Sequence, residues 1–294
     1  MSEFLVIVNP AAGRGRARRQ WPEIAQRLAA AGIQFEEVLT SSPGEAVAIA
    51  EKAWPLHASV FAAGGDGTVH EVVNGLMRAG ARAALGVIPL GSGDDFAKLL
   101  GSGDAVKRLI SKNIRKFDVG RITSGPATRY FANGMDIGFG AHGARNVALV
   151  PRWLTGFAAY LGALALTMLR YPLLRVRLQL DEAPPFEFTT AMTAVMNGTT
   201  FGGSFHVCPE ARADDGLLDL LLVEAVGRLG ILQLVPKILR GTHASDPRLR
   251  LLRAKRVIIE SAEPLLVEAD GEIAFQDARR LQVEVIPGAL TVLA

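Results

Sequence analysis

The chain has few of the features that mark secreted or membrane-spanning proteins. Its single cysteine, Cys208, excludes internal disulfides and any metal site built from cysteine alone. The opening residues, Met-Ser-Glu-Phe-Leu-Val-Ile-Val-Asn-Pro, lack the basic start and long apolar core of a signal peptide. We therefore expect a cytoplasmic location, to which peripheral membrane association could be added.

Long hydrophobic runs are also scarce. The one candidate, Trp153–Leu169, has no charged residue but is shorter than the roughly 20 apolar residues of a spanning helix. It is also interrupted by glycine and threonine, at Gly156, Gly162 and Thr167 among others. We expect a buried or interfacial helix there, with a spanning helix as the alternative.

Excess charge is absent too, since the net charge is only +3. This is too little to indicate a nucleic-acid partner, and we expect none. Basic residues do gather at Arg14–Arg19 and again at Arg248–Arg256. Such clusters are either solvated faces or surfaces that attract phosphate or an anionic membrane. The sequence leaves a homodimer open.

Hydrophobic residues, at 49% of 294, are plentiful enough for one large domain or two ordinary ones. Up to residue 124, strand-like and helix-like segments alternate, which predicts an α/β domain with a parallel sheet. From residue 125 onward, strand-like runs separated by turns predict a mainly-β sandwich domain. We place the boundary at Ser124-Gly-Pro126, giving domains 1–124 and 125–294. The expected strands are Phe4–Asn9, Ile33–Leu39, Ala58–Ala63, Ala84–Leu90, Leu173–Leu180, Phe186–Asn197, Leu217–Glu224, Arg256–Ser261 and Leu281–Ile286, and the expected helices Arg16–Ala31, Pro43–Trp54, one from Thr68, one after Gly91–Lys98, the Trp153 segment and Leu229–Leu239.

The most informative segment is Gly64-Gly65-Asp66-Gly67-Thr68, directly after the apolar run Ala58–Ala63. Glycines allow a tight turn and a close approach of the backbone to a bulky anion. Thr68 and Glu71 have the spacing of a capping box, so a helix is expected to begin here. A helix N-terminus binds anions. The segment therefore predicts an anion site, with a carboxylate in it that could hold a metal.

Two further glycine turns, Asn9–Gly15 and Gly91–Asp95, also follow expected strands. Ligands of open α/β sheets bind outside the carboxyl ends of the strands, so three such turns could enclose one nucleotide. The usual P-loop, the dinucleotide glycine motif after the first strand and the protein-kinase motifs are all absent from the sequence.

Taken together, these turns and several later acidic motifs resemble the catalytic domain of the diacylglycerol kinase family. The resemblance is to its soluble bacterial lipid kinase branch, which is related to the sphingosine kinases. It extends over nearly the whole chain. The matching segments are Asn9-Pro10 with Gly13, Gly64–Thr68 with Glu71 and Asn74-Gly75, Pro89–Ala97, Asp118–Gly120, Asn133–Gly140, Asp214–Asp219 and Asp270–Glu272.

The resemblance implies an N-terminal domain similar to NAD kinase and phosphofructokinase, a C-terminal β-sandwich and an active site in a cleft. It implies ATP and Mg²⁺ as cofactors and a membrane-borne lipid as substrate, most simply a diacylglycerol-like lipid, with phosphatidylglycerol or a sphingoid lipid as alternatives. The residues expected to bind the nucleotide are Asn9, Gly13, Arg14, Thr40, Gly64, Gly65, Asp66, Gly67, Thr68, Glu71, Gly91, Ser92 and Gly93.

Specific roles follow from the same resemblance. Asp66 is expected near the ATP phosphates and their magnesium, and Glu272 as the base that deprotonates the lipid hydroxyl. Asp95 and Asp118 are expected in an acidic network near the substrate that lysine and water link. Asp215, with the backbone carbonyl of Leu217, resembles a structural magnesium site. These roles fit phosphoryl transfer, which needs positioning and charge neutralisation more than covalent chemistry.

Structural explanations remain open for each assignment. Asp66 could be a turn residue and Glu71 a helix cap. The segments Asp214-Asp215-Gly216 and Asp270-Gly271 could form hairpin turns. Asp136, in a glycine-rich strand, has the composition of a hydrogen-bonded turn or bulge residue.

The chain departs from the family pattern at Asp94, where the family usually has asparagine. The extra negative charge beside the expected phosphates should weaken ATP binding unless magnesium or an arginine offsets it, and Arg14 and Arg16 are candidates. Two alternatives to an ATP-dependent lipid kinase therefore stay open. One is a non-catalytic protein that binds nucleotide or lipid, and the other is a kinase with a soluble acceptor.

Overall fold

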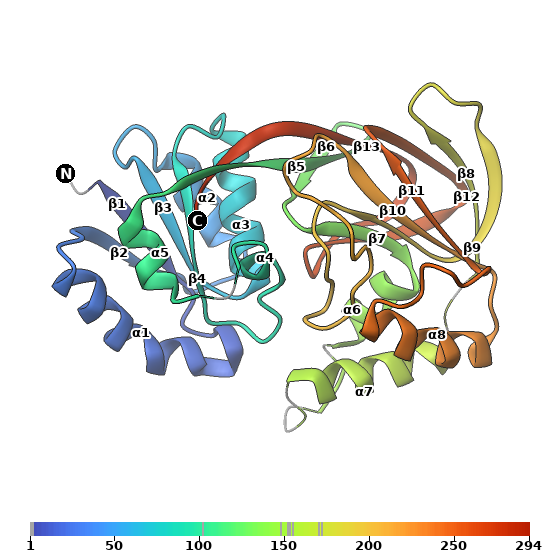
Figure 1. The fold of residues 1–294 in the computed structure, drawn as a ribbon, viewed down its shortest axis with the longest axis horizontal. Helices are drawn as coiled ribbons and strands as arrows, with labels where there is room; N and C mark the ends of the chain where they lie inside the picture. Colours follow the sequence, from blue (N-terminus) through green and yellow to red (C-terminus); the bar gives the residue numbers. More distant parts are fainter. Residues whose placement is uncertain are drawn as a thin grey trace. The chain divides into compact units, whose positions relative to one another are not determined.

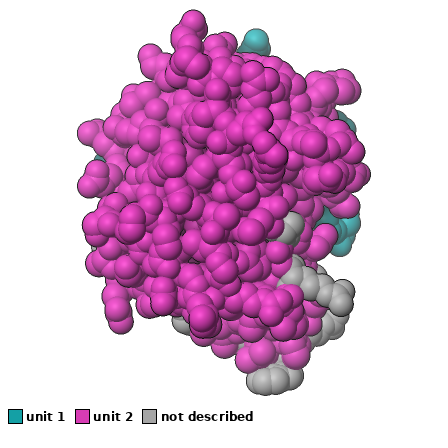
Figure 2. Space-filling model, turned by 90° about the vertical axis from the view of Figure 1, so that its right-hand side faces the viewer, with its two compact units in different colours: residues 1–118, 287–294 teal, residues 119–286 magenta. Residues whose placement is uncertain are grey.

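The computed structural model describes residues 3–294 except 102, 148, 152, 153, 155, 170 and 172, and gives only the backbone at 156, 157, 159 and 160. The chain divides into two compact units (Figure 2). Unit 1 comprises residues 1–118 and 287–294, and unit 2 comprises residues 119–286. The start of the apolar segment expected from Trp153 lies outside the described residues.

This division differs from the expected boundary in two ways. The last eight residues return to unit 1, where Val292 pairs in parallel with Leu85. Ser124-Gly-Pro126 is a hairpin turn inside unit 2 and not a linker, because Ser124 pairs with Ala127. Turn residues mark a reversal of the chain, but they do not distinguish a hairpin from a domain boundary.

Unit 1 contains a parallel sheet in the order β2-β1-β3-β4. Helices α1 and α5 lie on one side of this sheet, and α2 and α3 lie on the other (Figure 1). The core between α1, α5 and the sheet is apolar and includes Trp21, Phe61 and Leu109. The elements are β1 (Phe4–Val8), α1 (Ala12–Ala30), β2 (Phe35–Leu39), α2 (Glu45–Lys52), β3 (Ser59–Gly64), α3 (Asp66–Arg78), β4 (Ala84–Pro89), α4 (Asp95–Lys98), α5 (Ala105–Ser111) and the first part of β5 (Ile114–Ser124).

Helix α1 begins irregularly. Gly13, Arg14 and Gly15 all have positive φ, so the regular helix starts at Arg16, as the sequence predicts. Consecutive left-handed residues turn the chain sharply directly after β1. The first glycine turn is therefore a kinked loop at the carboxyl end of a strand.

Unit 2 is built on antiparallel strands in the order β11-β10-β9-β7-β12-β13, and β8 pairs with both β9 and β12. Alternate residues of these strands form an apolar core that includes Val195, Leu220 and Val267. The elements are the rest of β5, β6 (Ala127–Phe131), β7 (Gly134–Gly138), α6 (Phe139–Val147), α7 (Gly156–Leu169), β8 (Leu174–Leu180), β9 (Phe186–Met196), β10 (Leu218–Glu224), α8 (Arg228–Arg240), β11 (Leu249–Ala254), β12 (Arg256–Ala269) and β13 (Glu272–Leu293), whose end belongs to unit 1.

A second apolar cluster of unit 2 lies where helices α6 and α8 cover strands β9 and β10, and Phe139, Leu221 and Leu234 belong to it. Helix α7 packs against α6. None of the described helices is long and apolar enough to cross a membrane. The alternative of a spanning helix is therefore not supported for the described part of the segment.

Candidate functional site

The three glycine turns of unit 1 meet at the carboxyl ends of β1, β3 and β4. A Cβ on Gly65 would lie only 2.9 Å from the Cα of Gly91. A Cβ on Gly13 would lie 2.5 Å from the carbonyl oxygen of Leu90. Glycine is required at these positions because the backbones touch there, and the convergence that the sequence predicts is present.

Hydrogen bonds join the first two turns and the end of β2. The side-chain amide of Asn9 donates to Oγ1 of Thr68 over 3.1 Å. The amide of Thr40 donates to the carbonyl of Val8 over 2.9 Å, so Thr40 lies beside the end of β1. Arg14, Gly67, Ser92 and Gly93 lie within the same turns, with Arg14 and Ser92 exposed.

The expected capping box is wrong. Helix α3 begins at Asp66, its N-cap is Gly65, and no side chain caps it. The carboxylate of Glu71 instead accepts hydrogen bonds from the amides of Gly44 (2.8 Å) and Ala46 (3.1 Å) at the start of α2. Glu71 is therefore a helix cap, which is one of the two interpretations of this residue. It caps α2, however, and not its own helix α3. The spacing of Thr68 and Glu71 correctly indicated a capping residue, but it assigned Glu71 to the wrong helix.

Asp66 lies at the centre of the converging turns. Its Oδ1 accepts hydrogen bonds from the amides of Asp95 (2.6 Å) and Phe96 (3.4 Å). Burial, together with the nearby carboxylates of Asp95 and Asp94, raises the pKa of Asp66 to about 7. Crowded acidic groups of this kind are stabilised by a cation.

Asp94 is partly compensated within unit 1. Its Oδ2 lies 3.5 Å from the guanidinium of Arg16, and its Oδ1 accepts a hydrogen bond from the amide of Gly91 over 2.9 Å. Arg16 also donates to the carbonyl of Gly91. Burial still raises the pKa of Asp94, while the Gly91 amide, Arg16 and Lys98 oppose the rise. Arg16, one of the two candidates, therefore pairs with this carboxylate.

The other acidic residues expected in unit 1 are Asp95 and Asp118. Asp95 is buried, and its Oδ1 accepts a hydrogen bond from Nζ of Lys98 over 2.7 Å. Asp118 is also buried, and its Oδ1 accepts a hydrogen bond from the amide of Gly288 over 2.7 Å. Asp118 therefore fastens the returning end of the chain to unit 1.

In unit 2, Glu272 follows a tight hairpin turn between β12 and β13. Asp270 and Gly271 have φ values of 50° and 94°, the left-handed pair that a two-residue hairpin uses. The carboxylate of Asp270 accepts hydrogen bonds from the amides of Ala132, Asn133 and Gly134. These three hydrogen bonds hold the turn in place. Glu272, the next residue after the turn, is exposed.

Asp215 already has protein partners. It accepts a hydrogen bond from the amide of Leu217 over 3.1 Å and pairs with Arg253. The same arginine binds Asp219 over 3.0 Å. Throughout the part of the chain that the structure describes, no group of three or more His, Cys, Asp or Glu side chains is arranged to hold a metal ion. The magnesium site at Asp215 and Leu217 stays a prediction.

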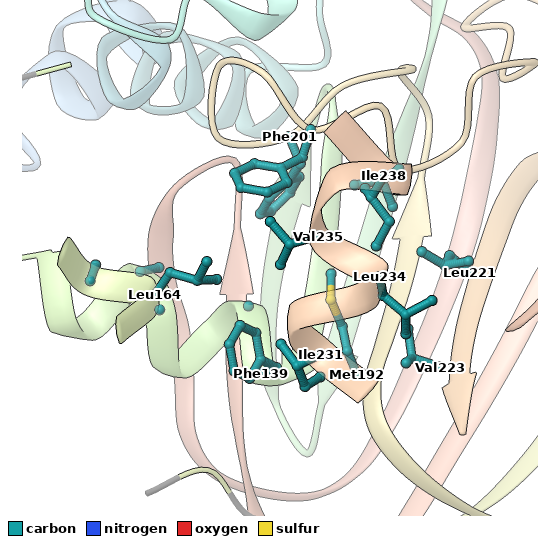
Figure 3. Close-up of a pocket in the computed structure, with 16 residues that line it drawn as sticks. Phe139, Leu164, Met192, Phe201, Leu221, Val223, Ile231, Leu234, Val235 and Ile238 are labelled. Carbon is teal, nitrogen blue, oxygen red and sulfur yellow. The ribbon is translucent and has the colours of Figure 1, made fainter. Parts of the chain in front are cut away.

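Sequence reasoning missed an apolar pocket in unit 2. It holds about 830 Å³ of space not filled by protein atoms, part of it open to solvent. Figure 3 shows side chains from α6, α7, α8, β9 and β10 around it. Every lining residue is apolar, and the labelled ones are Phe139, Leu164, Met192, Phe201, Leu221, Val223, Ile231, Leu234, Val235 and Ile238.

The sequence held one signal of this pocket. Helix α8 carries one buried isoleucine and one buried leucine, Ile231 and Leu234, but also strongly exposed leucines such as Leu229, which is 76% exposed. The apolar face of such a helix is wider than a core contact requires. The lining strands, in contrast, are indistinguishable from ordinary core strands.

Comparison with known proteins agrees with this architecture. Residues 3–122 match the diacylglycerol kinase catalytic domain, and residues 133–294 match the YegS C-terminal NAD kinase beta sandwich-like domain. The chain is 33% identical to a "Probable lipid kinase YegS-like" of Pseudomonas aeruginosa, over 98% of this chain and 93% of that one. It is 29% identical to a diacylglycerol kinase of Bacillus subtilis, over 92% and 90% of the two chains.

A solved structure of a diacylglycerol kinase from Bacillus anthracis superposes with a TM-score of 0.75 at 25% identity, covering 99% of this chain and 96% of that one. The expected two-domain architecture, with a β-sandwich-like second domain, is thereby confirmed. The chain belongs to the diacylglycerol kinase catalytic domain family, in the branch of bacterial lipid kinases with a YegS-type C-terminal domain.

Proposed function

We propose that the protein transfers the γ-phosphoryl group of ATP to the hydroxyl of a diacylglycerol-like lipid. The observation that carries this proposal is the pocket of unit 2, whose lining is entirely apolar. Each methylene buried from water contributes about 0.8 kcal/mol, so such a pocket selects an acyl chain. A soluble acceptor such as a nucleotide would leave its polar groups without partners there.

The turns of unit 1 supply the nucleotide side. The backbone amide of Gly13 and those at the α3 N-terminus are suited to phosphate oxygens, whereas the amide of Gly15 already donates to the carbonyl of Ala11. Asp66 is the carboxylate suited to hold Mg²⁺, which usually binds one or two carboxylates together with phosphate and water. The fit is supported by the raised pKa of Asp66 among acidic neighbours. Bound there, the ion would neutralise phosphate charge.

Glu272 is the proposed base. A carboxylate within hydrogen-bond reach of the lipid hydroxyl accepts its proton as the oxygen attacks. Glu272 is exposed, and its turn is fixed by the three amides that bind Asp270. A fixed turn keeps a general base in position without closing the site.

We further propose that the lipid is reached by transient contact with an anionic membrane. Helices α7 and α8, which line the pocket, also carry exposed leucines, and Leu169, Leu229 and Leu232 are 63%, 76% and 53% exposed. The arginine cluster at residues 248–256 should contribute less to membrane attraction than its sequence suggests. Its members pair with acidic residues: Arg248 with Asp246, Arg250 with Glu224, Arg253 with Asp215 and Asp219, and Arg256 with Glu182.

The non-catalytic alternative rested on the extra charge of Asp94. That charge lies 3.5 Å from Arg16, so the reason for expecting poor ATP binding is weakened. A soluble acceptor remains an outcome of the experiment below.

The test is an assay with γ-labelled ATP, Mg²⁺ and vesicles that contain dioleoylglycerol, phosphatidylglycerol or sphingosine in separate samples. The expected result is label in the organic phase with dioleoylglycerol and its loss in Asp66→Asn. Label in phosphatidylglycerol or sphingosine instead would identify that lipid as the acceptor in place of diacylglycerol. Label only in a soluble acceptor such as NAD, or none in any acceptor, would contradict the proposal.

A further inference from the structure

Two acidic side chains lie opposite each other in the interior of unit 2. Asp136 of β7 and Glu268 of β12 are cross-strand partners in an antiparallel pair. Both are 0% exposed. Carboxyl groups are almost never buried completely unless they are paired, so this placement requires an explanation.

Ordinary hydrogen bonds do not explain it. Among the described residues, no well-aligned donor reaches either oxygen of Asp136 or Oε2 of Glu268, although the amides of Gly140 and Ala141 lie close enough to lower the pKa of Asp136. The remaining oxygen, Oε1 of Glu268, accepts a hydrogen bond from the amide of Gly271. Three buried acceptor oxygens thus lack a well-aligned donor, and two facing carboxylates satisfy each other only when a proton lies between them.

The surroundings favour that proton. The charged groups that act on Glu268 are Asp136, Asp270 and Glu272, all acidic, and with burial they raise the pKa of Glu268. Burial likewise raises the pKa of Asp136, and it outweighs the opposing hydrogen bonds from Glu268 and from the amides of Gly140 and Ala141. Helix α6, which packs on both strands, carries His142 and Arg145. The ring of His142 is engaged with the carbonyl of Gly138, and its pKa is lowered by burial.

We propose that Asp136 and Glu268 share one proton and act as a positioning pair for Glu272. The inference rests on the proposed role of Glu272 as the base. On one side, Glu268 binds the amide of Gly271, the residue directly before Glu272. Loss of the shared proton would leave two facing negative charges, whose repulsion would displace the turn.

On the other side, the pair contacts the wall of the apolar pocket. Gly140, in the first turn of α6, lies against Asp136, and a Cβ at this position would collide with Oδ2 of Asp136. Phe139 and Gly140 both line the pocket. Within unit 2, the Asp136–Glu268 pair therefore links the wall of the pocket to the turn that precedes Glu272.

The first experiment detects the proton without any enzymatic assay. Infrared spectra at pH 7, recorded on the whole protein with Asp66→Asn because Asp66 has a pKa of about 7, should show a protonated carboxylic acid. This band should disappear when Glu268→Gln or Asp136→Asn is added, but persist with Glu263→Gln, a change at an exposed carboxylate of the same strand as Glu268. Either isosteric variant is sufficient if the other does not fold. Absence of a protonated carboxyl from the spectrum of the Asp66→Asn protein at pH 7 would overturn the proposal.

Thermal unfolding tests in which direction the stability of the protein changes with pH. Because the folded pair holds its proton above the ordinary carboxyl pKa of about 4, its stabilisation is complete below that pH and is lost as pH rises. The wild-type unfolding temperature should therefore fall toward alkaline pH more steeply than that of Glu268→Gln, whose amide donates permanently to Asp136. Equal slopes would contradict a shared proton.

The second experiment tests positioning. Glu268→Leu removes the bond to Gly271 and should lower kcat by up to about 10²-fold, the cost of a misplaced catalytic group, with the KM for ATP retained. Glu268→Gln should recover much of this loss and move the alkaline limb of the kcat profile. If Leu and Gln are equally impaired, or the limb does not move, the positioning role is wrong. If the infrared proton is present but no lipid is phosphorylated by wild type, the proposed function fails instead.

Discussion

The carboxylate of Asp66 accepts a hydrogen bond from the amide of Asp95, with 2.6 Å between Oδ1 and N. This contact joins the turn after β3 to the turn after β4. Asp66 therefore has a structural role in the site in addition to its proposed role toward magnesium and phosphate. Substitution by asparagine separates the two roles, because an amide oxygen still accepts this bond.

We expect Asp66→Asn to lower kcat by roughly 10²–10³, the usual cost of removing one electrostatic stabiliser of a transition state. The unfolding temperature should stay the same or rise. Burial and the neighbouring carboxylates raise the pKa of Asp66, so its ionised form opposes folding near neutral pH. Label transfer and circular dichroism measure the two effects. Wild-type turnover in a folded variant would overturn the assignment of the nucleotide site.

Arg16 and Asp94 should behave as a coupled pair. Arg16→Ala leaves the charge of Asp94 uncompensated and should weaken MgATP binding. Adding Asp94→Asn in that background should restore part of the affinity, whereas Asp94→Asn alone should change it little. Calorimetry on the four proteins gives the coupling. Tighter binding by the single Asp94→Asn variant would show that Arg16 does not offset the charge.

Glu272→Gln should lower kcat by roughly 10²–10⁴ and leave ATP affinity nearly intact, because only proton transfer is lost. Steady-state kinetics with varied ATP and lipid separates the two constants. Asp277→Asn, an exposed acidic residue of the same strand, is the matched control. An equal loss of ATP affinity and kcat would place Glu272 at the nucleotide.

Membrane contact should depend on leucines more than on the second arginine cluster. We expect Leu229→Ser with Leu232→Ser to reduce binding to anionic vesicles, and Arg250→Gln, whose guanidinium is paired with Glu224, to change it little. Vesicle sedimentation at rising salt measures both. Trp153, a natural fluorescence reporter, lies outside the described residues. Binding that depends on Arg250 and is unaffected by the leucine changes would contradict this prediction.

Much of unit 1 could be predicted from the sequence, because the patterns that indicate its strands and turns are local. Glycine turns directly after apolar runs located the ends of β1, β3 and β4. Alternating segments and parallel strands also agree with what the sequence pattern predicts. The helix that Glu71 caps could not be read, because its partners, Gly44 and Ala46, are distant in sequence.

The second unit was less predictable, because its site depends on contacts between distant strands and helices. No local pattern shows that Phe139 and Leu234 line one pocket. The pairing of Asp136 with Glu268 depends on strand register in the same way. A usable signal was present, however, since Glu268 interrupts the otherwise apolar run Leu265–Ala269. A charge within such a run indicates a buried polar role.

The most direct test of the account is the dependence of kcat/KM on acyl-chain length, measured with diacylglycerols of short and long chains at constant ATP. The wild type should prefer the long chain. Val235→Phe, which fills the pocket, should remove that preference and leave the short-chain value near wild type, while Leu232→Phe on the exposed side of α8 should leave the preference intact. An equal loss with both lipids in Val235→Phe, or no chain-length preference in the wild type, would contradict the claim that this pocket holds the lipid.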